Sequence, residues 1–251
     1  MYPYIQFWGL KISSYGMMMC VACVIVGAIC LRRAKLRHVL AEDVLIVAAF
    51  AIGFGLFCGG LLFVFITYPV EYIWQCIING QYHIFLGGIV FYGGLIGGVL
   101  GALLGCKVAR CSVDAMIRVV VPYIPLGHGI GRIGCVLAGC CYGIPYEGPL
   151  AIHISANPRA GYFPVQLVEA VINIGICAAL HRYERKAKPI SLLALYLVFY
   201  AVVRFGLEFV RGDEIRGIAA GLSSSQWISV MLIGISMILF LLEYFQIKKH
   251  R

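Results

Sequence analysis

Long apolar runs, bounded by charged or turn-forming residues, dominate the pattern of hydrophobic and polar positions along the chain. Seven runs approach the length of about 20 residues that a helix needs to cross a hydrocarbon core of about 30 Å. Each run is therefore predicted to form a transmembrane helix. The predicted spans cover residues 13–31, 44–68, 86–108, 119–140, 165–181, 190–209 and 226–245.

Glycines set two of these spans apart. In "YGGLIGGVLGALLG" they recur every fourth residue, as at Gly94 and Gly98 or Gly97 and Gly101, which lets helices approach closely. A second dense run of glycines lies in the fourth span and just after it, and each glycine costs a helix interior about 1 kcal/mol relative to alanine. We therefore expect an interrupted helix lining a wet cavity, because open backbone at membrane depth needs partners. These glycines are Gly127, Gly129, Gly131, Gly134, Gly139 and Gly143.

The composition supports an all-α integral membrane protein. Hydrophobic residues make up 62% of the 251 residues and charged residues only 12%, which excludes an ordinary soluble globule. No linker or internal repeat is evident, so residues 1–251 are predicted to form a single membrane domain. Two outer segments are predicted, 1–12 before the first span and 142–164 between the fourth and fifth. Within the second, apolar and polar residues alternate over Ala151–Ser155, which predicts a short strand.

The basic residues predict the orientation of the spans. Most of the 20 lie in the segments 31–43, 107–118 and 182–189 and in the C-terminal tail, and the alternate segments hold few. Lys and Arg accumulate in cytoplasmic loops, so the N-terminus is expected outside and the C-terminus in the cytoplasm. The same loops account for the formal net charge of +9, so we expect no nucleic-acid partner.

Two arginines, Arg132 and Arg204, fall inside predicted spans, where a charge costs a few kcal/mol and usually faces a protein interior or a wet cavity. Such an arginine can also tie helices together through an ion pair, or extend its head to the interface. Two residues share a helix face with Arg132, namely His128 four positions earlier and Cys135 three positions later.

The second arginine belongs to a stripe of the same spacing, because Arg204, Glu208 and Arg211 also run i, i+4, i+7. Both stripes lie toward the outer ends of their spans. We predict that they share one site, and arginine's planar fork of donors suits a phosphate or carboxylate. The expected ligand is an anionic lipid headgroup.

Three cysteines, Cys135, Cys140 and Cys141, are crowded beside this stripe. Their spacing does not match the C-x-x-C pattern of zinc or thioredoxin motifs, so no metal is predicted. Three interpretations stay open. A thiol beside Arg132 and His128 has its thiolate form favoured. A disulfide with another outer cysteine, and simple packing, are the alternatives.

The motifs, in order, resemble those of the prolipoprotein diacylglyceryl transferase family. "GIGRIGC" stands at the family's G-x-G-R-x-G-N core, and "FYGGLIGG" at its H-G-G-L-I-G. Likewise "GYFPVQLVEA" is similar to P-S-Q-L-Y-E, and "YAVVRFGLEFVRGDE" to F-R-x-x-x-E-x-x-R. "SSYG" and "SSSQW" are similar to family elements of the first and last spans.

The resemblance implies a bacterial-type plasma-membrane enzyme, without a cofactor, whose site faces outward. It would move a diacylglyceryl group from phosphatidylglycerol to the thiol of a lipobox cysteine in a preprolipoprotein. Arg132, Arg204 and Glu208 would form the core of the site. The substrate would contact the residues that match the remaining motifs: Tyr15, Tyr92, Gly93, Gly94, Gly143, Gln166, Glu169 and Arg211.

Three positions depart from the family pattern. Tyr92 stands at the family histidine, Cys135 at its asparagine and Leu61 at an arginine of the second span. A phenol, with a pKa of ~10 instead of ~6.5 for imidazole, is a poor base at neutral pH. His128 is the candidate replacement base on the Arg132 face.

These departures leave alternatives to the family reaction open. One is a divergent transferase with another acceptor, or with a covalent intermediate on Cys135 or Cys141. The other is a non-catalytic lipid-binding membrane protein. A transporter is disfavoured because no paired half-repeats are visible.

Overall fold

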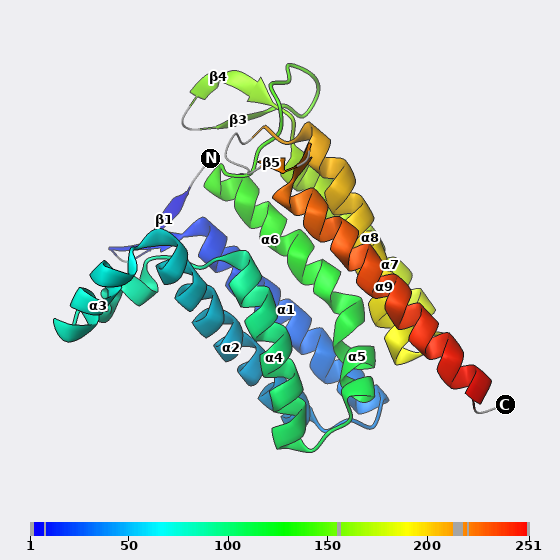
Figure 1. Cartoon of the computed structure of the whole chain (residues 1–251). Coiled ribbons are helices and arrows are strands. Elements are labelled where there is room, and N and C mark those ends of the chain that lie inside the picture. The colour runs from blue at the N-terminus through cyan, green and yellow to red at the C-terminus, as the bar shows by residue number, and fades with distance from the viewer. Residues whose placement is uncertain (1–2, 8, 155–156, 213–217, 220, 250–251) are drawn as a thin grey trace. The chain divides into compact units, whose positions relative to one another are not determined.

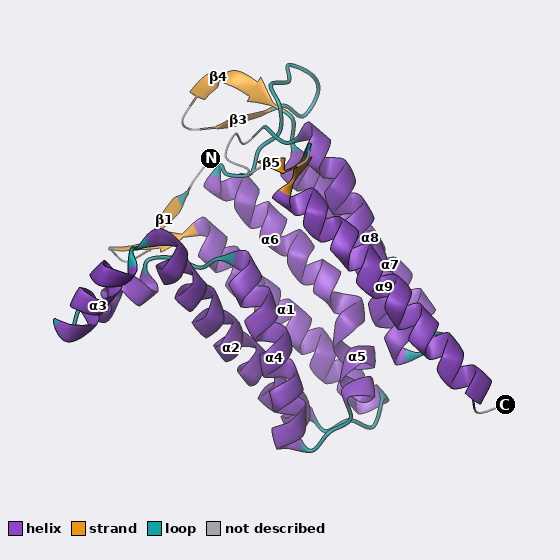
Figure 2. Cartoon of the chain, viewed as in Figure 1, coloured by secondary structure: helices purple, strands orange, loops and turns teal. Residues whose placement is uncertain are grey.

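The structure is a computed structural model that describes residues 3–7, 9–154, 157–212, 218–219 and 221–249. Seven of its helical segments, among these residues, are long and apolar enough to cross a membrane, which confirms the predicted all-α membrane fold (Figure 2). They are Ser14–Leu36 (α1), Ala41–Thr67 (α2), Phe91–Ala109 (α4), Val113–Ala138, Val165–Tyr183 (α7), Pro189–Val210, which begins with α8 (Pro189–Leu207), and Ser224–Phe245 within α9 (Ser224–Lys249).

Short elements that hydropathy did not predict connect the spans. They include an amphipathic helix, α3 (Val70–Ile78), and the turn η1 (Tyr82–Leu86). The predicted strand at residues 151–155 is confirmed for residues 152–154, whereas Ser155 lies outside the described residues. Three antiparallel hairpins pair β1 (Tyr4–Phe7) with β2 (Leu10–Ser13), β3 (Ile152–Ile154) with β4 (Asn157–Tyr162), and β5 (Ile218–Ala219) with β6 (Leu222–Ser223).

The expected interruption among the glycines of the fourth span is wrong. This span consists of α5 (Val113–Val120), a 3-10 turn η2 (Val121–Tyr123) and α6 (Ile124–Ala138), and α6 runs unbroken through its glycines. The break comes earlier, at Pro122, because proline has no N–H to continue the ladder. Helix α6 then ends at Gly139, whose φ of 74° is the left-handed conformation of a helix C-cap.

Close packing accounts for the glycines of α6. A Cβ at Gly129 would lie 3.1 Å from the carbonyl oxygen of Ala170 in α7. One at Gly134 would lie 3.0 Å from Cβ of Met18 in α1. The glycines therefore admit α7 and α1 to van der Waals contact, which offsets their low helix propensity.

The chain forms two compact units. The first comprises residues 1–30 and 117–251, and the second residues 31–116. In the first unit α6 packs on α7, and α8 lies along both α7 and α9 (Figure 1). Leu180, Leu192 and Tyr196 are central to its buried core. Most of the predicted site residues lie in this unit.

In the second unit α2 and α4 pack along a stripe of glycines, as the four-residue spacing predicted. A Cβ at Gly93 would lie 2.6 Å from the carbonyl oxygen of Cys58, and one at Gly105 would lie 2.8 Å from Cα of Val47. Gly97 and Gly101 are closer still to the α2 backbone, at Phe54 and Phe50. No larger residue fits along this contact without separating the helices.

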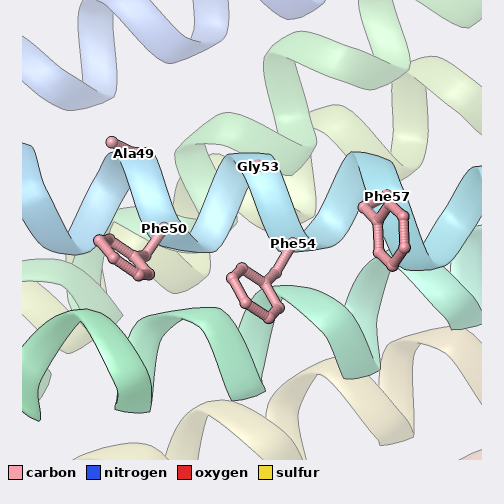
Figure 3. A pocket seen from close by; sticks show the side chains of 5 residues that line it. All are labelled: Ala49, Phe50, Gly53, Phe54 and Phe57. Atoms are coloured by element: carbon pink, nitrogen blue, oxygen red, sulfur yellow. The ribbon is translucent and has the colours of Figure 1, made fainter.

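A hollow of about 440 Å³ follows α2 in the second unit (Figure 3). Phe50 and Phe54, whose rings stack 6.2 Å apart, line it together with Phe57. The other lining residues, Ala49 and Gly53, are also apolar. Because its lining is almost entirely apolar, this hollow suits hydrocarbon.

Candidate active site

Arg132 of α6 forms an ion pair with Glu169 of α7, and Nη2 lies 2.9 Å from Oε1. The Glu169 side chain is only 4% exposed and that of Arg132 21% exposed. Gly129 lies about one turn before Arg132, and Ala170 directly follows Glu169. The close approach of the two backbones at these residues allows the ion pair to form. Because a buried carboxylate needs a partner, the pair also fixes the rotation of α6 against α7.

Arg204, near the end of α8, has two partners. Its Nη2 atom lies 3.3 Å from Oε2 of Glu208, and the same nitrogen donates a 2.9 Å hydrogen bond to Oγ of Ser225 in α9. Glu208 begins a 3-10 turn, η3 (Glu208–Val210), as α8 ends. The Arg204 side chain is only 13% exposed, so its charge is held largely within protein.

The two arginine stripes converge. The Arg204 guanidinium interacts electrostatically with Arg132, Arg211 and Glu169 as well as with Glu208. Arg204 therefore lies within electrostatic range of Arg132 and of the carboxylates of Glu169 and Glu208 in the first unit. Two guanidinium groups next to each other favour an anion between them.

Several buried polar atoms at this site have no hydrogen-bond partner among the described residues. They are Nη1 of Arg204, Oε2 of Glu169 and Oε1 of Gln166. Buried donors and acceptors are satisfied in most native proteins, by protein, water or a ligand. These atoms are therefore available to a bound headgroup or to ordered water.

The loop after α6 joins the arginine site through main-chain bonds. Gly143 and Arg211 form an isolated β-bridge, and Gly143 also donates to the carbonyl of Phe163 over 3.0 Å. A Cβ at Gly143 would lie 2.7 Å from that oxygen, so only glycine fits. Gln166 fixes the same loop, because its Nε2 donates a 2.7 Å hydrogen bond to the carbonyl of Cys140.

Cys135, Cys140 and Cys141 come together where α6 ends, with their Sγ atoms all within 4.8 Å of one another. The left-handed residues Gly139 and Cys141, with φ of 74° and 60°, turn the chain back toward α6. All three cysteines are free thiols, and Nη1 of Arg132 lies 3.9 Å from Sγ of Cys135.

The thiols differ in acidity. Hydrogen bonds with the Cys135 and Cys140 thiols, helped by the charges of Arg211 and Arg132, hold the pKa of Cys141 well below its ordinary value. Within the same network the pKa of Cys140 is raised, because its hydrogen bonds to Cys135 and Cys141 favour the protonated thiol. Cys141 is therefore the more readily ionised of these two neighbours.

His128 contacts residues of α8, and Tyr15 lies at the start of α1. The Nδ1 atom of His128 lies 3.3 Å from the hydroxyl of Tyr196, and its ring lies 5.5 Å from that of Tyr200, both in α8. Tyr15 is exposed at the start of α1, against Gly134, and interacts electrostatically with Arg132.

Tyr92, Gly93 and Gly94 belong to the second unit, whereas the other predicted residues belong to the first. Tyr92 begins α4 with its side chain 36% exposed and its ring 5.7 Å from that of Phe91. Gly93 packs on the α2 backbone, and a Cβ at Gly94 would lie 3.6 Å from the carbonyl of Gly55.

Two polar residues of the site were missed by sequence reasoning. Ser225 accepts from Arg204, and the buried Asn173 donates a 2.8 Å hydrogen bond to the carbonyl of Glu169. Asn173 carried a signal, as an amide within a predicted span four residues after Glu169. Ser225 lies in the "SSSQW" motif, but its bond with Arg204 could not be predicted, because the contact joins two helices.

Comparisons with known proteins agree with this architecture. Residues 3–242 match the family model of prolipoprotein diacylglyceryl transferase. A phosphatidylglycerol–prolipoprotein diacylglyceryl transferase of Clostridium tetani is 35% identical, covering 96% of this chain and 97% of that protein. The phosphatidylglycerol–prolipoprotein diacylglyceryl transferase 2 of Clostridium perfringens is 30% identical, covering 91% of this chain and 90% of that protein.

Proposed function

The chain belongs to the prolipoprotein diacylglyceryl transferase family, and on this premise we propose that it moves the diacylglyceryl group of phosphatidylglycerol to the thiol of a prolipoprotein cysteine. The single observation that carries the proposal is the convergence of Arg132 and Arg204 beside buried polar atoms that lack protein partners among the described residues. Such a site suits a lipid phosphate.

In the proposed reaction the thiol sulfur attacks the diacylglyceryl carbon that carries the phosphate oxygen. A thioether S–C bond forms, the C–O bond breaks, and glycerol phosphate leaves with the bonding electrons. Negative charge grows on the leaving phosphate, and the guanidinium groups of Arg132 and Arg204 stabilise it there. Glu169 and Glu208 hold the two guanidinium groups in place and limit their mutual repulsion.

The remaining predicted residues take supporting roles in the proposal. His128 accepts the proton of the acceptor thiol, and its hydrogen bond with Tyr196 orients the ring for this. Tyr15, Gln166 and Arg211, together with the Gly143 loop, contact the headgroup. Tyr92, Gly93 and Gly94, which match a family motif, are proposed to contact the substrate as well.

The proposal places the protein in a bacterial-type plasma membrane, as one membrane domain, with its N-terminus and active site toward the outside. The distribution of lysine and arginine supports this orientation. The outer location also suits an acceptor cysteine that belongs to a secreted prolipoprotein.

The test is an assay of the purified protein in vesicles. Vesicles of phosphatidylglycerol and a lipobox peptide should yield glycerol phosphate and thioether-linked peptide. Vesicles of phosphatidylcholine, and a peptide with serine for cysteine, are the matched controls. Binding of phosphatidylglycerol without release would overturn the proposal in favour of a lipid-binding protein. A diacylglyceryl adduct on Cys135 or Cys141 would replace direct transfer by a covalent route.

A further inference from the structure

The cysteine cluster has the composition of a metal site, although its spacing in the sequence does not match a zinc motif. We propose that the thiols of Cys135, Cys140 and Cys141 bind one zinc ion, with the fourth coordination position open to the acceptor thiol. The proposed binding of zinc does not depend on the proposed transferase function. The role of the open position rests on the proposed transferase function.

The geometry of the three sulfurs suits zinc. A tetrahedral ion with Zn–S bonds of about 2.3 Å places its sulfurs about 3.8 Å apart. The three Sγ atoms lie within 4.8 Å of one another, so small side-chain rotations suffice to close the site. Main-chain structure holds them there, because Cys140 donates a 3.1 Å bond from its N–H to the carbonyl of Cys135.

The number of donors indicates an open site. The cluster consists of three sulfurs, and no fourth His, Cys, Asp or Glu of the described residues belongs to it. Structural zinc sites are almost always closed by four protein ligands, whereas catalytic sites have three and keep the fourth position for water or substrate. Cys140 is exposed, which gives the ion and the acceptor a route from solvent.

The surrounding charges complement such a site. Three thiolates and one Zn²⁺ carry a net charge of −1. Arg132 lies 3.9 Å from Sγ of Cys135, and both Arg132 and Arg211 interact electrostatically with Cys141. The arginines therefore offset the negative charge of the zinc-bound cluster. Arg132 also belongs to the site where the lipid phosphate is proposed to bind.

A zinc ion here would supply what the acceptor most needs. A thiol that coordinates zinc is deprotonated outright, so the acceptor would bind as a thiolate and release its proton to His128, the base of the proposed reaction. Its sulfur would then attack the diacylglyceryl carbon while the C–O bond to phosphate breaks. No electron transfer is involved. The chain has a tyrosine, Tyr92, where its family resemblance predicts a histidine, and zinc provides another means of activating the thiol.

Metal binding can be tested without substrate. Reduced, metal-free protein in detergent should bind one equivalent of Co²⁺ with a thiolate-to-cobalt charge-transfer band, and Zn²⁺ should displace it stoichiometrically. Loss of a residue that only hydrogen-bonds to a metal ligand weakens metal binding roughly 10- to 100-fold. Cys140→Ser removes a ligand itself, at the exposed cysteine of the cluster, so it should weaken zinc binding by more than this. Cys135→Ser and Cys141→Ser should do the same.

The matched control is Cys177→Ser, at a half-buried cysteine of α7 outside the cluster, which should retain full binding. Size-exclusion profiles establish that each variant is folded. If the buried Cys135→Ser variant aggregates, zinc binding by the Cys140→Ser variant alone tests the site. Absence of the cobalt band in the wild type, or a disulfide between two of the three cysteines in freshly purified protein, would overturn the zinc site.

The open position has its own readout. A lipobox peptide should change the spectrum of the cobalt-loaded protein in the absence of phosphatidylglycerol, and a peptide with serine for cysteine should not. Cobalt binding without this response would overturn the open position. Transfer by protein that binds no metal would sink the inference and leave the transferase function intact. A cobalt site that responds to the peptide, without any glycerol phosphate release, would sink the transferase function instead.

Discussion

Nη2 of Arg132 in α6 lies 2.9 Å from Oε1 of Glu169 in α7, so a nearly buried carboxylate holds this guanidinium group. This contact joins α6 to α7. Each carboxylate therefore balances a charge that the membrane would otherwise disfavour, and the electrostatic interaction between the arginines connects the two pairs.

Replacing Glu169 by glutamine should impair both stability and turnover. The variant keeps the shape of the side chain but leaves Arg132 without its carboxylate, and breaking a buried pair costs about 3 kcal/mol or more. We expect a lower unfolding temperature in detergent and at least tenfold slower release of glycerol phosphate. Normal values of both would show that the pair serves neither purpose.

Arg204→Lys should reduce turnover about 100-fold or more, because lysine keeps the charge but loses the planar fork of donors. Release of glycerol phosphate from phosphatidylglycerol vesicles measures the effect. Arg159→Lys, at an exposed position of β4, is the matched control and should behave as the wild type. Equal activity of the two variants would remove Arg204 from the site.

His128→Ala should lower the rate by roughly 100-fold, the usual contribution of a positioned base. His128→Gln, which can keep a hydrogen bond with the Tyr196 hydroxyl, separates proton transfer from packing. If the glutamine variant folds normally but remains slow, the base role is supported. A full rate for either variant would eliminate His128 as the base.

Gly143→Ala should destabilise the loop that holds Arg211. The new Cβ would lie 2.7 Å from the carbonyl of Phe163, and such overpacking costs about 1–3 kcal/mol. Gly175→Ala in α7 is the control, since a Cβ there meets no atom within 4 Å. Thermal unfolding of both variants tests this, and a Gly143→Ala protein as stable as the control would contradict the packing.

The spans and the Arg132 stripe could be predicted from the sequence because both depend on local information. An apolar run long enough to cross a bilayer is visible residue by residue. The i, i+4, i+7 spacing of His128, Arg132 and Cys135 likewise fixes a shared face of α6 before any neighbour is known. The four-residue glycine spacing of α4 predicted its close contact with α2 for the same reason. The i, i+4, i+7 spacing is wrong for Arg211, because α8 ends at Leu207 and Arg211 has an extended backbone.

Other features depended on partners far apart in the chain. The glycines of α6 predicted a broken helix, but Ala170 and Met18 pack against them, and contacts of this kind outweigh local propensity. The meeting of Arg132 with Glu169, and of Cys135 with Cys140 and Cys141, required the turn at Gly139 and the packing of α7. By itself the sequence determined which groups face the membrane interior and at what spacing. Only the tertiary structure decided which of them meet, because contact between elements depends on how their backbones pack.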